Sequence, residues 1–88
     1  MVIFSIVYAK RALNDIPKLK AAGLDKKAKL LIELLKENPY KMPPPFEKLK
    51  GDLNGAISRL INRQHRLVYE VNEEEKTVKI IKLWTHYE

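Results

Sequence analysis

The sequence predicts an α+β fold in the order β-α-α-β-β-β, with two helices packed on one face of a small, mostly antiparallel four-stranded sheet. β-Branched and aromatic residues gather near the start, apolar residues alternate as in a strand over residues 66–71, and apolar residues follow helical spacing between these stretches. The 88 residues suit one domain, residues 1–88. A composition of 45% hydrophobic and 32% charged residues is typical of a globular protein.

The first strand and first helix are predicted from the opening residues. Residues 2–8 are rich in β-branched and aromatic side chains, which favour a strand. Helical spacing begins at Ala9. Pro17 lacks a backbone donor, so we expect the helix to end near Asp15, to kink, or to restart afterwards. Residues 21–23 (Ala-Ala-Gly) form a plausible helix end.

The second helix is defined by one apolar stripe. The stripe runs from Leu24 to Leu35, and Asn38-Pro39 ends it. Residues 39–51 contain three consecutive prolines and cannot form a helix or a central strand. We expect this segment to be a stiff connection that carries side chains across the face of the sheet.

Three further strands are predicted in the second half, at residues 56–62, 66–71 and 77–84. The apolar pattern of the last strand changes phase midway, at Ile80 and Ile81. Such a change indicates either a strand buried on both faces or a β-bulge. With the helices on one side of the sheet, the other face could hold a ligand.

The net charge of +6 is concentrated in the first half. Residues 1–36 hold eight Lys or Arg against three Asp or Glu, a net of +5, and residues 37–88 hold nine against eight, a net of +1. Lys26, Lys27 and Lys29 lie off the apolar stripe of the second helix. This distribution suggests either a polyanionic partner bound through its phosphates or a solvated lysine-rich surface.

Several chemistries lack support in the sequence. There is no cysteine, which excludes disulfides and thiolate sites and fits a reducing cytoplasm. No signal peptide or membrane span is evident. The two histidines form no metal-binding motif, and the three glycines form no phosphate loop. We therefore expect no metal, no cofactor and a cytoplasmic location.

Cleavage of RNA through its own 2′-hydroxyl remains open to this chain. That reaction needs a base, a cation beside the phosphate and an acid. Glu47, Arg66 and the His86-Tyr87 pair could supply them from distant parts of the sequence. The alternatives are that Glu47 is only solvated and that Arg66 pairs with Glu70 on the same strand.

Two aromatic residues suit structural roles better. His65 points away from Arg66 if their strand is regular, so we expect it to be structural. Trp84 is expected to be a core or edge anchor rather than a platform for a base. Composition and spacing alone lead to a basic α+β domain with candidate RNA chemistry.

The second half of the chain resembles the YoeB/Txe family of RelE/ParE superfamily toxins. Residues 43–55 (PPPFEKLKGDLNG) resemble the family's P-E-x-L-K-x-x-L-x-G segment, and Ser58-Arg59 follow. Residues 61–69 (INRQHRLVY) resemble its I-x-x-x-H-R-L-V-Y segment, and His86-Tyr87 match its terminal H-Y. The resemblance is close over residues 39–88, whereas the first half matches only in element order and basic character.

This resemblance implies a toxin that cleaves mRNA on the ribosome and is neutralised by an antitoxin of the YefM/Axe type. It implies general-base, phosphate-stabilising and general-acid roles for Glu47, Arg66 and His86, and a substrate-orienting role for Tyr87. The implied partners are the antitoxin, the ribosome and mRNA, and a homodimer is expected from the resemblance alone. No membrane is implied.

Other positions extend the resemblance or depart from it. Lys50 and Arg59 match basic positions that line the family's site. Leu60 stands where many members have a second arginine, which removes one supporting phosphate contact. Glu88 follows the usual terminal tyrosine, and Pro17 is a further departure of unpredicted effect.

Two other functional classes remain open. A non-catalytic nucleic-acid-binding module would depend on Lys26, Lys27 and Lys29 and not on Glu47. An inactive relative that serves only as a binding partner should have lost a residue of the acid-base set, yet that set is intact.

Overall fold

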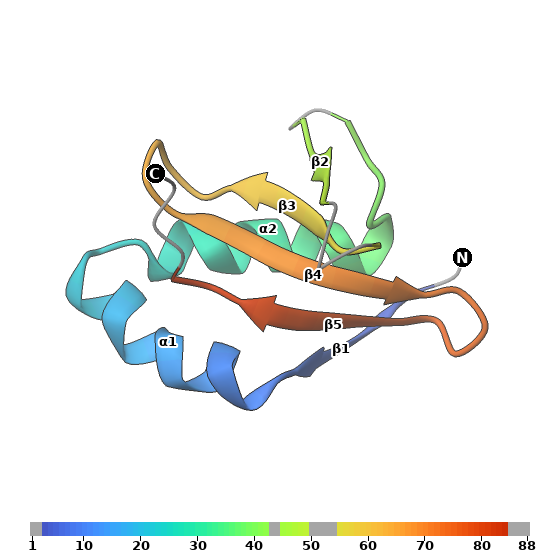
Figure 1. The fold of residues 1–88 in the computed structure, drawn as a ribbon, viewed down its shortest axis with the longest axis horizontal. Helices are drawn as coiled ribbons and strands as arrows, with labels where there is room; N and C mark the ends of the chain where they lie inside the picture. Colours follow the sequence, from blue (N-terminus) through green and yellow to red (C-terminus); the bar gives the residue numbers. More distant parts are fainter. Residues whose placement is uncertain (1–2, 43–44, 50–54, 85–88) are drawn as a thin grey trace.

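The structure, a computed structural model, describes residues 3–42, 45–49 and 55–84. Within these residues the chain forms two helices and five strands: β1 (Ser5–Tyr8), α1 (Lys10–Ala21), α2 (Asp25–Glu37), β2 (Glu47–Lys48), β3 (Ile57–Leu60), β4 (Arg66–Asn72) and β5 (Thr77–Lys82). The sheet has the order β1-β5-β4-β3-β2, with β1 parallel to β5 and the other neighbours antiparallel (Figure 1). The predicted α+β class is confirmed, but the described sheet has five strands rather than four, because β2 adds an edge.

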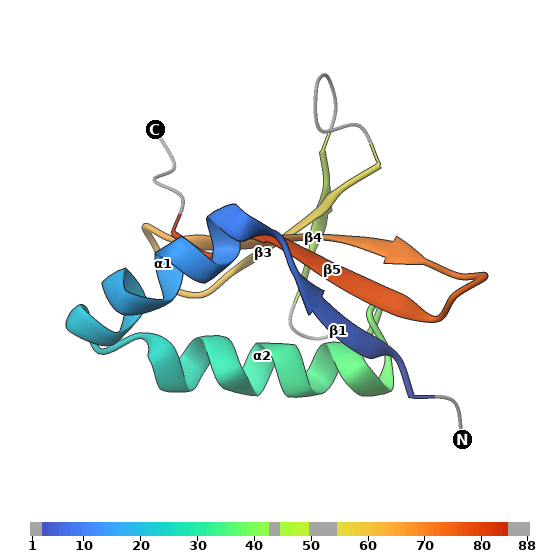
Figure 2. The same cartoon turned by 90° about the horizontal axis from the view of Figure 1, so that it is seen from below.

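Both helices pack on one face of the sheet. Figure 2 shows α2 lying along this face, and α1 contacts β5 and β1. Leu19 of α1 and Leu35 of α2 are buried in one cluster with Leu67, Tyr69 and Ile80 of the sheet. Burial of this apolar surface is the main force that holds the two layers together. Neither described helix combines the length and the apolarity needed to cross a bilayer.

Alternation along β4 separates the two faces of the sheet. Leu67 and Tyr69 point to the helices and are fully buried. Arg66 and Glu70 lie on the opposite face, here called the outer face, because successive strand residues point to opposite sides. The alternation predicted for residues 66–71 is therefore confirmed.

A β-bulge explains the change of phase in the last strand. Tyr69 pairs with Ile80, but Val68 pairs with Lys82, so Ile81 is an extra residue on β5. The bulge returns Leu83 to the helix-facing side, where it is buried. Of the two predicted explanations, the bulge is the one observed.

Pro17 does not end the first helix. α1 runs from Lys10 to Ala21 with Pro17 inside it. Because Pro17 has no N–H, the carbonyl of Leu13 lacks its usual helical donor. Both residues are exposed, so water can bond to that carbonyl instead. The predicted end at residues 21–23 is confirmed, and Gly23 adopts the left-handed φ of +73° that closes many helices.

Two strands end earlier than predicted, because backbone N–H groups that follow them donate to side-chain oxygens. β3 stops at Leu60 instead of residue 62, because the Asn62 carboxamide accepts hydrogen bonds from the N–H groups of Gln64 and His65 and turns the chain. β5 stops at Lys82 instead of residue 84, because the next two N–H groups donate to Asp15. β1 begins at Ser5 rather than at residue 2.

Candidate active site

Glu47 and Arg66 meet on the outer face of the sheet. β2 pairs with β3 so that Glu47 lies opposite Ser58. Arg66, at the start of β4, donates from Nη1 to Glu47 Oε2 at 2.7 Å and to Ser58 Oγ at 3.3 Å. Two of the predicted catalytic residues, nineteen positions apart in the sequence, are thus in direct contact.

The neighbours of Glu47 explain why it points outward. Phe46 packs against the core, and the Arg59 guanidinium lies 5.0 Å from the centre of its ring. Because side chains alternate along an extended segment, the packing of the partly buried Phe46 against the core directs Glu47 to the outer face. The N–H of Leu49 donates to the carbonyl of Ala56, which extends the pairing with β3. The predicted stiff connection over residues 39–51 therefore contains an edge strand that presents Glu47.

The pair borders a shallow hollow of about 150 Å³. Pro45, Phe46, Ser58 and Leu60 complete its lining. The Glu47 side chain is 64% exposed, whereas that of Arg66 is 16% exposed. A guanidinium offers five N–H donors in a planar fork, so Arg66 can bond to a phosphate while one nitrogen stays near Glu47. An exposed carboxylate beside it can accept a proton from a bound hydroxyl.

Arg59 does not lie in this site. Its side chain is on the helix-facing side, and the residue is only 1% exposed. Nε donates to the hydroxyl of Tyr69 at 3.0 Å, and Nη2 donates to the carbonyls of Pro39 and Lys41 at 3.1 and 2.9 Å. Direct contact with a phosphate, the role predicted from the resemblance, does not fit this burial. Arg59 instead fixes the segment that follows α2 to β3 and β4.

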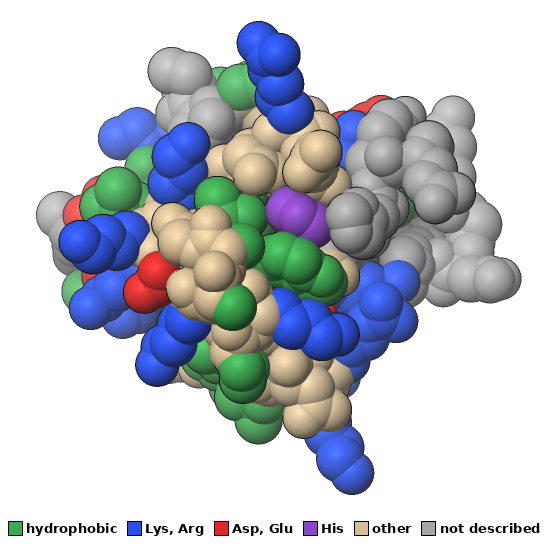
Figure 3. Space-filling view, turned by 90° about the vertical axis from the view of Figure 1, so that its left-hand side faces the viewer, with side chains coloured by type: hydrophobic (Ala, Val, Ile, Leu, Met, Phe, Trp, Pro, Cys, Tyr) green, Lys and Arg blue, Asp and Glu red, His purple; other side chains and the backbone are tan. Residues whose placement is uncertain are grey.

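The predicted lysines lie away from the Glu47–Arg66 pair. Lys26, Lys27 and Lys29 are exposed on α2, which covers the helix-facing side of the sheet. Figure 3 shows the end of the molecule where α1 leads into α2, with Lys and Arg side chains projecting and few carboxylates in view. Lys50, His86 and Tyr87 lie outside the described residues.

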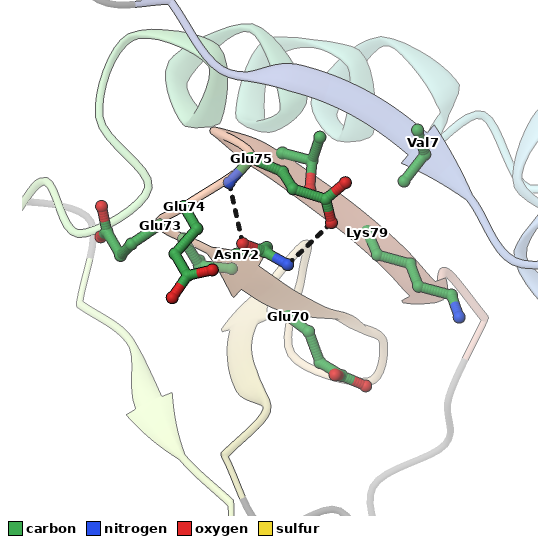
Figure 4. A pocket seen from close by; sticks show the side chains of 9 residues that line it. Val7, Glu70, Asn72, Glu73, Glu74, Glu75 and Lys79 are labelled. Carbon is green, nitrogen blue, oxygen red and sulfur yellow. Dashed lines mark hydrogen bonds between the residues drawn. The ribbon is translucent and has the colours of Figure 1, made fainter.

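A larger hollow, of about 700 Å³, lies beside the turn between β4 and β5 (Figure 4). Glu70, Glu73, Glu74 and Glu75 line it. Hydrogen bonds from Lys76 and Tyr40 lower the pKa of the Glu73 carboxyl, so this carboxyl is charged at neutral pH. Such a lining repels phosphates, so the smaller hollow at Arg66 suits RNA better.

The described residues hold no group of three or more His, Asp or Glu side chains placed to bind a metal ion.

His65 is 4% exposed and stacks on Trp84, with ring centres 3.8 Å apart. Both therefore have the structural roles that were predicted.

Sequence reasoning missed two polar contacts. Ser58 accepts a hydrogen bond from Arg66, and the sequence feature that could have indicated this contact is the position of Ser58 on the same face as Glu47. Asp15 is buried and accepts a hydrogen bond from the N–H of Leu83, at the end of β5. The sequence feature that could have indicated this is a lone acid among the apolar positions of a helix. The burial of Arg59 was also readable, because Arg59 shares the strand phase of Ile57 and Ile61.

The fold, two helices on one face of a five-stranded mixed sheet, is that of a small RelE-like toxin. Residues 8–87 match the family described as the YoeB-like toxin of bacterial type II toxin–antitoxin systems, and the chain belongs to this family. A toxin YoeB from Synechocystis is 36% identical over 63 residues, which cover 72% of this chain and 71% of that protein.

Solved structures agree with this assignment. A YoeB/ParE toxin from Agrobacterium tumefaciens is 29% identical, with a TM-score of 0.84 over 96% of this chain and 100% of that one. A Staphylococcus aureus YoeB, solved both with YefM and as a dimer, is 31% identical. Its TM-score is 0.79 over 96% of this chain and 98% of that one.

Proposed function

We propose that this toxin is a ribosome-dependent endoribonuclease that acts on translated mRNA in the cytoplasm. It would cleave without metal, by acid-base use of the RNA 2′-hydroxyl. The observation that supports this proposal is the contact between an exposed Glu47 and the Arg66 guanidinium on the outer face of the sheet. Membership of the YoeB-like family supports it from the sequence side.

Each group has one role in the proposed reaction. Glu47 accepts the proton of the 2′-hydroxyl, and the 2′-oxygen attacks the phosphorus. Arg66 stabilises the added negative charge of the phosphorane. The bond from phosphorus to the 5′-oxygen then breaks, and His86 gives that oxygen its proton. The products are a 2′,3′-cyclic phosphate and a 5′-hydroxyl. Tyr87 orients the substrate in this scheme.

The proposed partners are an antitoxin, a second copy of the chain, the ribosome and mRNA. The S. aureus relative was solved with YefM and as a dimer, and by analogy we propose a YefM-type antitoxin and a homodimer for this chain. Lys26, Lys27 and Lys29 would contact ribosomal RNA from α2 while the outer face receives mRNA. Lys50 would supply a further phosphate contact. Long-range attraction by this charge would speed association.

Inducible expression in bacteria with mapping of mRNA 5′ ends tests the function. We expect cuts at a fixed phase within translated codons, and their loss in Glu47→Gln and Arg66→Ala. Glu70→Gln is the matched control, because Glu70 is an exposed carboxylate on the same face outside the hollow. Growth arrest that persists in Glu47→Gln but disappears when the α2 lysines are replaced would instead favour the non-catalytic binding module.

A further inference from the structure

The side of α2 that faces away from the sheet carries exposed apolar residues. Figure 2 shows the sheet and α1 on one side of α2, and no other described element on the opposite side. Leu30, which lies on this open side, is 71% exposed and is the most exposed large apolar residue of the described chain. Exposed apolar surface bordered by charged residues is typical of a protein–protein contact.

Leu30 and Leu34 form a ridge between two hollows. One hollow, of about 330 Å³, extends from the ridge to Leu60 and Ile61 at the end of β3. The other, of about 350 Å³, extends to Ile3 and the last turn of α2. Both leucines line both hollows. A ridge with a hollow on each side can interlock with a second copy of itself, as the side chains of packed helices do.

The ridge belongs to a line of four residues along α2: Lys27, Leu30, Leu34 and Glu37. Their intervals of three, four and three residues are those of the contact line between two packed helices. We call this line the α2 seam. It has a cation at one end and a carboxylate at the other. Both end residues are exposed, and neither forms an ion pair with another described residue.

The α2 seam is complementary to itself when two copies run antiparallel. In a two-fold contact, each pair of facing residues occurs twice, with the two copies exchanged. An axis at the level of Ile32 sets Leu30 of one copy against Leu34 of the other. The same axis sets Lys27 against Glu37. Parallel helices would instead set each charged residue against its own counterpart, which like charges disfavour.

We propose that the α2 seam is the interface of a symmetric dimer of this toxin, in which the two α2 helices run antiparallel. This inference rests on the homodimer of the proposed function and assigns that dimer a face. Of the lysines proposed to bind ribosomal RNA, only Lys27 lies in the seam, so Lys26 and Lys29 stay open to RNA. The outer face with Glu47 and Arg66 also stays open in each copy, because α2 covers the other side of the sheet.

Sedimentation velocity of the purified toxin over a range of concentrations tests the interface. We expect the wild type to dimerise and Leu30→Lys to weaken dimerisation at least about 100-fold. Burial of one leucine accounts for about tenfold or more, and the contact contains this leucine twice. Leu13→Lys is the matched control, because Leu13 is a 51% exposed leucine on α1 outside both hollows. Far-UV circular dichroism checks that the variants are folded.

Lys27→Glu and Glu37→Lys test the antiparallel order. Each variant alone places like charges against each other at both ends of its dimer, so each should dimerise about tenfold more weakly than the wild type at low salt. When the two variants are mixed, opposite charges face each other at both ends, and the mixed dimer should regain the wild-type affinity. In a parallel dimer the wild type already sets like charges together, so neither variant alone would be weaker. That result would overturn the arrangement, as would a mixture that binds no more tightly than its components.

The remaining outcomes separate this inference from the proposed function. A dimer that Leu30→Lys weakens no more than Leu13→Lys does would leave the homodimer standing and overturn the α2 seam as its interface. A wild type that stays monomeric at every concentration would overturn both. If Leu30→Lys then also lost binding to a YefM-type antitoxin, the seam would belong to the antitoxin instead. The nuclease activity is tested separately, by the mapping of mRNA 5′ ends with Glu47→Gln.

Discussion

Ser58 and Arg59 are neighbours on β3 that serve opposite faces of the sheet: Ser58 bonds to Arg66 in the candidate active site, and Arg59 bonds to Tyr69 beneath it. One strand thereby joins the site to the interior. We expect substitutions in the candidate active site to change activity and substitutions of the buried Arg59 and Tyr69 to change stability. Function and stability can therefore be tested separately.

Arg59→Met should destabilise the fold strongly. The substitution removes the donors for the carbonyls of Pro39 and Lys41 and the contact with the Phe46 ring. Buried groups that lose a charged partner cost about 3 kcal/mol in the free energy of unfolding. Urea denaturation measures this change. Arg63→Met, at an exposed position, should stay within about 0.5 kcal/mol of wild type. If Arg59→Met kept the wild-type stability but lost cleavage, Arg59 would instead contact the phosphate directly.

Tyr69 should make the protein sensitive to alkaline pH. Burial raises the pKa of its hydroxyl above the ordinary 10.0, although the bond from Arg59 opposes this. The folded state therefore keeps a proton that the unfolded state releases, and the free energy of unfolding falls as the pH rises above about 10.

Tyr69→Phe removes this titration together with the 2.6 Å bond to the Pro39 carbonyl. We expect the variant to be less stable at pH 8, with a shallower further loss between pH 9 and 11. Urea midpoints across that range measure both slopes. Equal slopes in the two proteins would contradict the assignment of the alkaline loss to Tyr69.

Glu47→Gln should separate activity from stability. Glu47 is 64% exposed, and an ion pair that solvent reaches contributes about 0–1 kcal/mol to stability, so the urea midpoint should hardly move. Loss of a general base lowers turnover by about 10²–10⁴-fold. The two measurements are the urea midpoint and the single-turnover rate on translating ribosomes. A fall in stability that accounts for the whole loss of activity would count against the catalytic role.

Replacement of Lys26, Lys27 and Lys29 by alanine should weaken binding to ribosomes without affecting the reacting groups. Each bound phosphate releases counterions, so the slope of log affinity against log salt should become shallower by about one for every phosphate that is no longer bound. Sedimentation of the toxin with ribosomes at several salt concentrations measures this slope.

Lys10, Lys41 and Lys79, which are exposed and scattered over other elements, give a control of equal charge when replaced together. Equal weakening by both triple variants would show that only net charge matters.

The sequence predicted what depends on local pattern and missed what depends on packing between distant segments. Alternation in β4 correctly placed Leu67 and Tyr69 inside. The resemblance anticipated the meeting of Glu47 with Arg66, which spacing alone could not. β2 escaped prediction because two residues beside prolines form a strand only once β3 is present to pair with them. Asp15 escaped because its partners lie 68 and 69 positions away.

The parallel pairing of β1 with β5 also has a consequence for biosynthesis. Ser5 pairs with Thr77, so the earliest strand to leave the ribosome finds its neighbour only after more than seventy further residues have been made. Until then Phe4 and Ile6 lack the strand beside them. Because such long-range pairing forms late, the nascent chain remains without its finished sheet through most of its own synthesis. A toxin of this topology therefore completes its sheet only towards the end of its own synthesis.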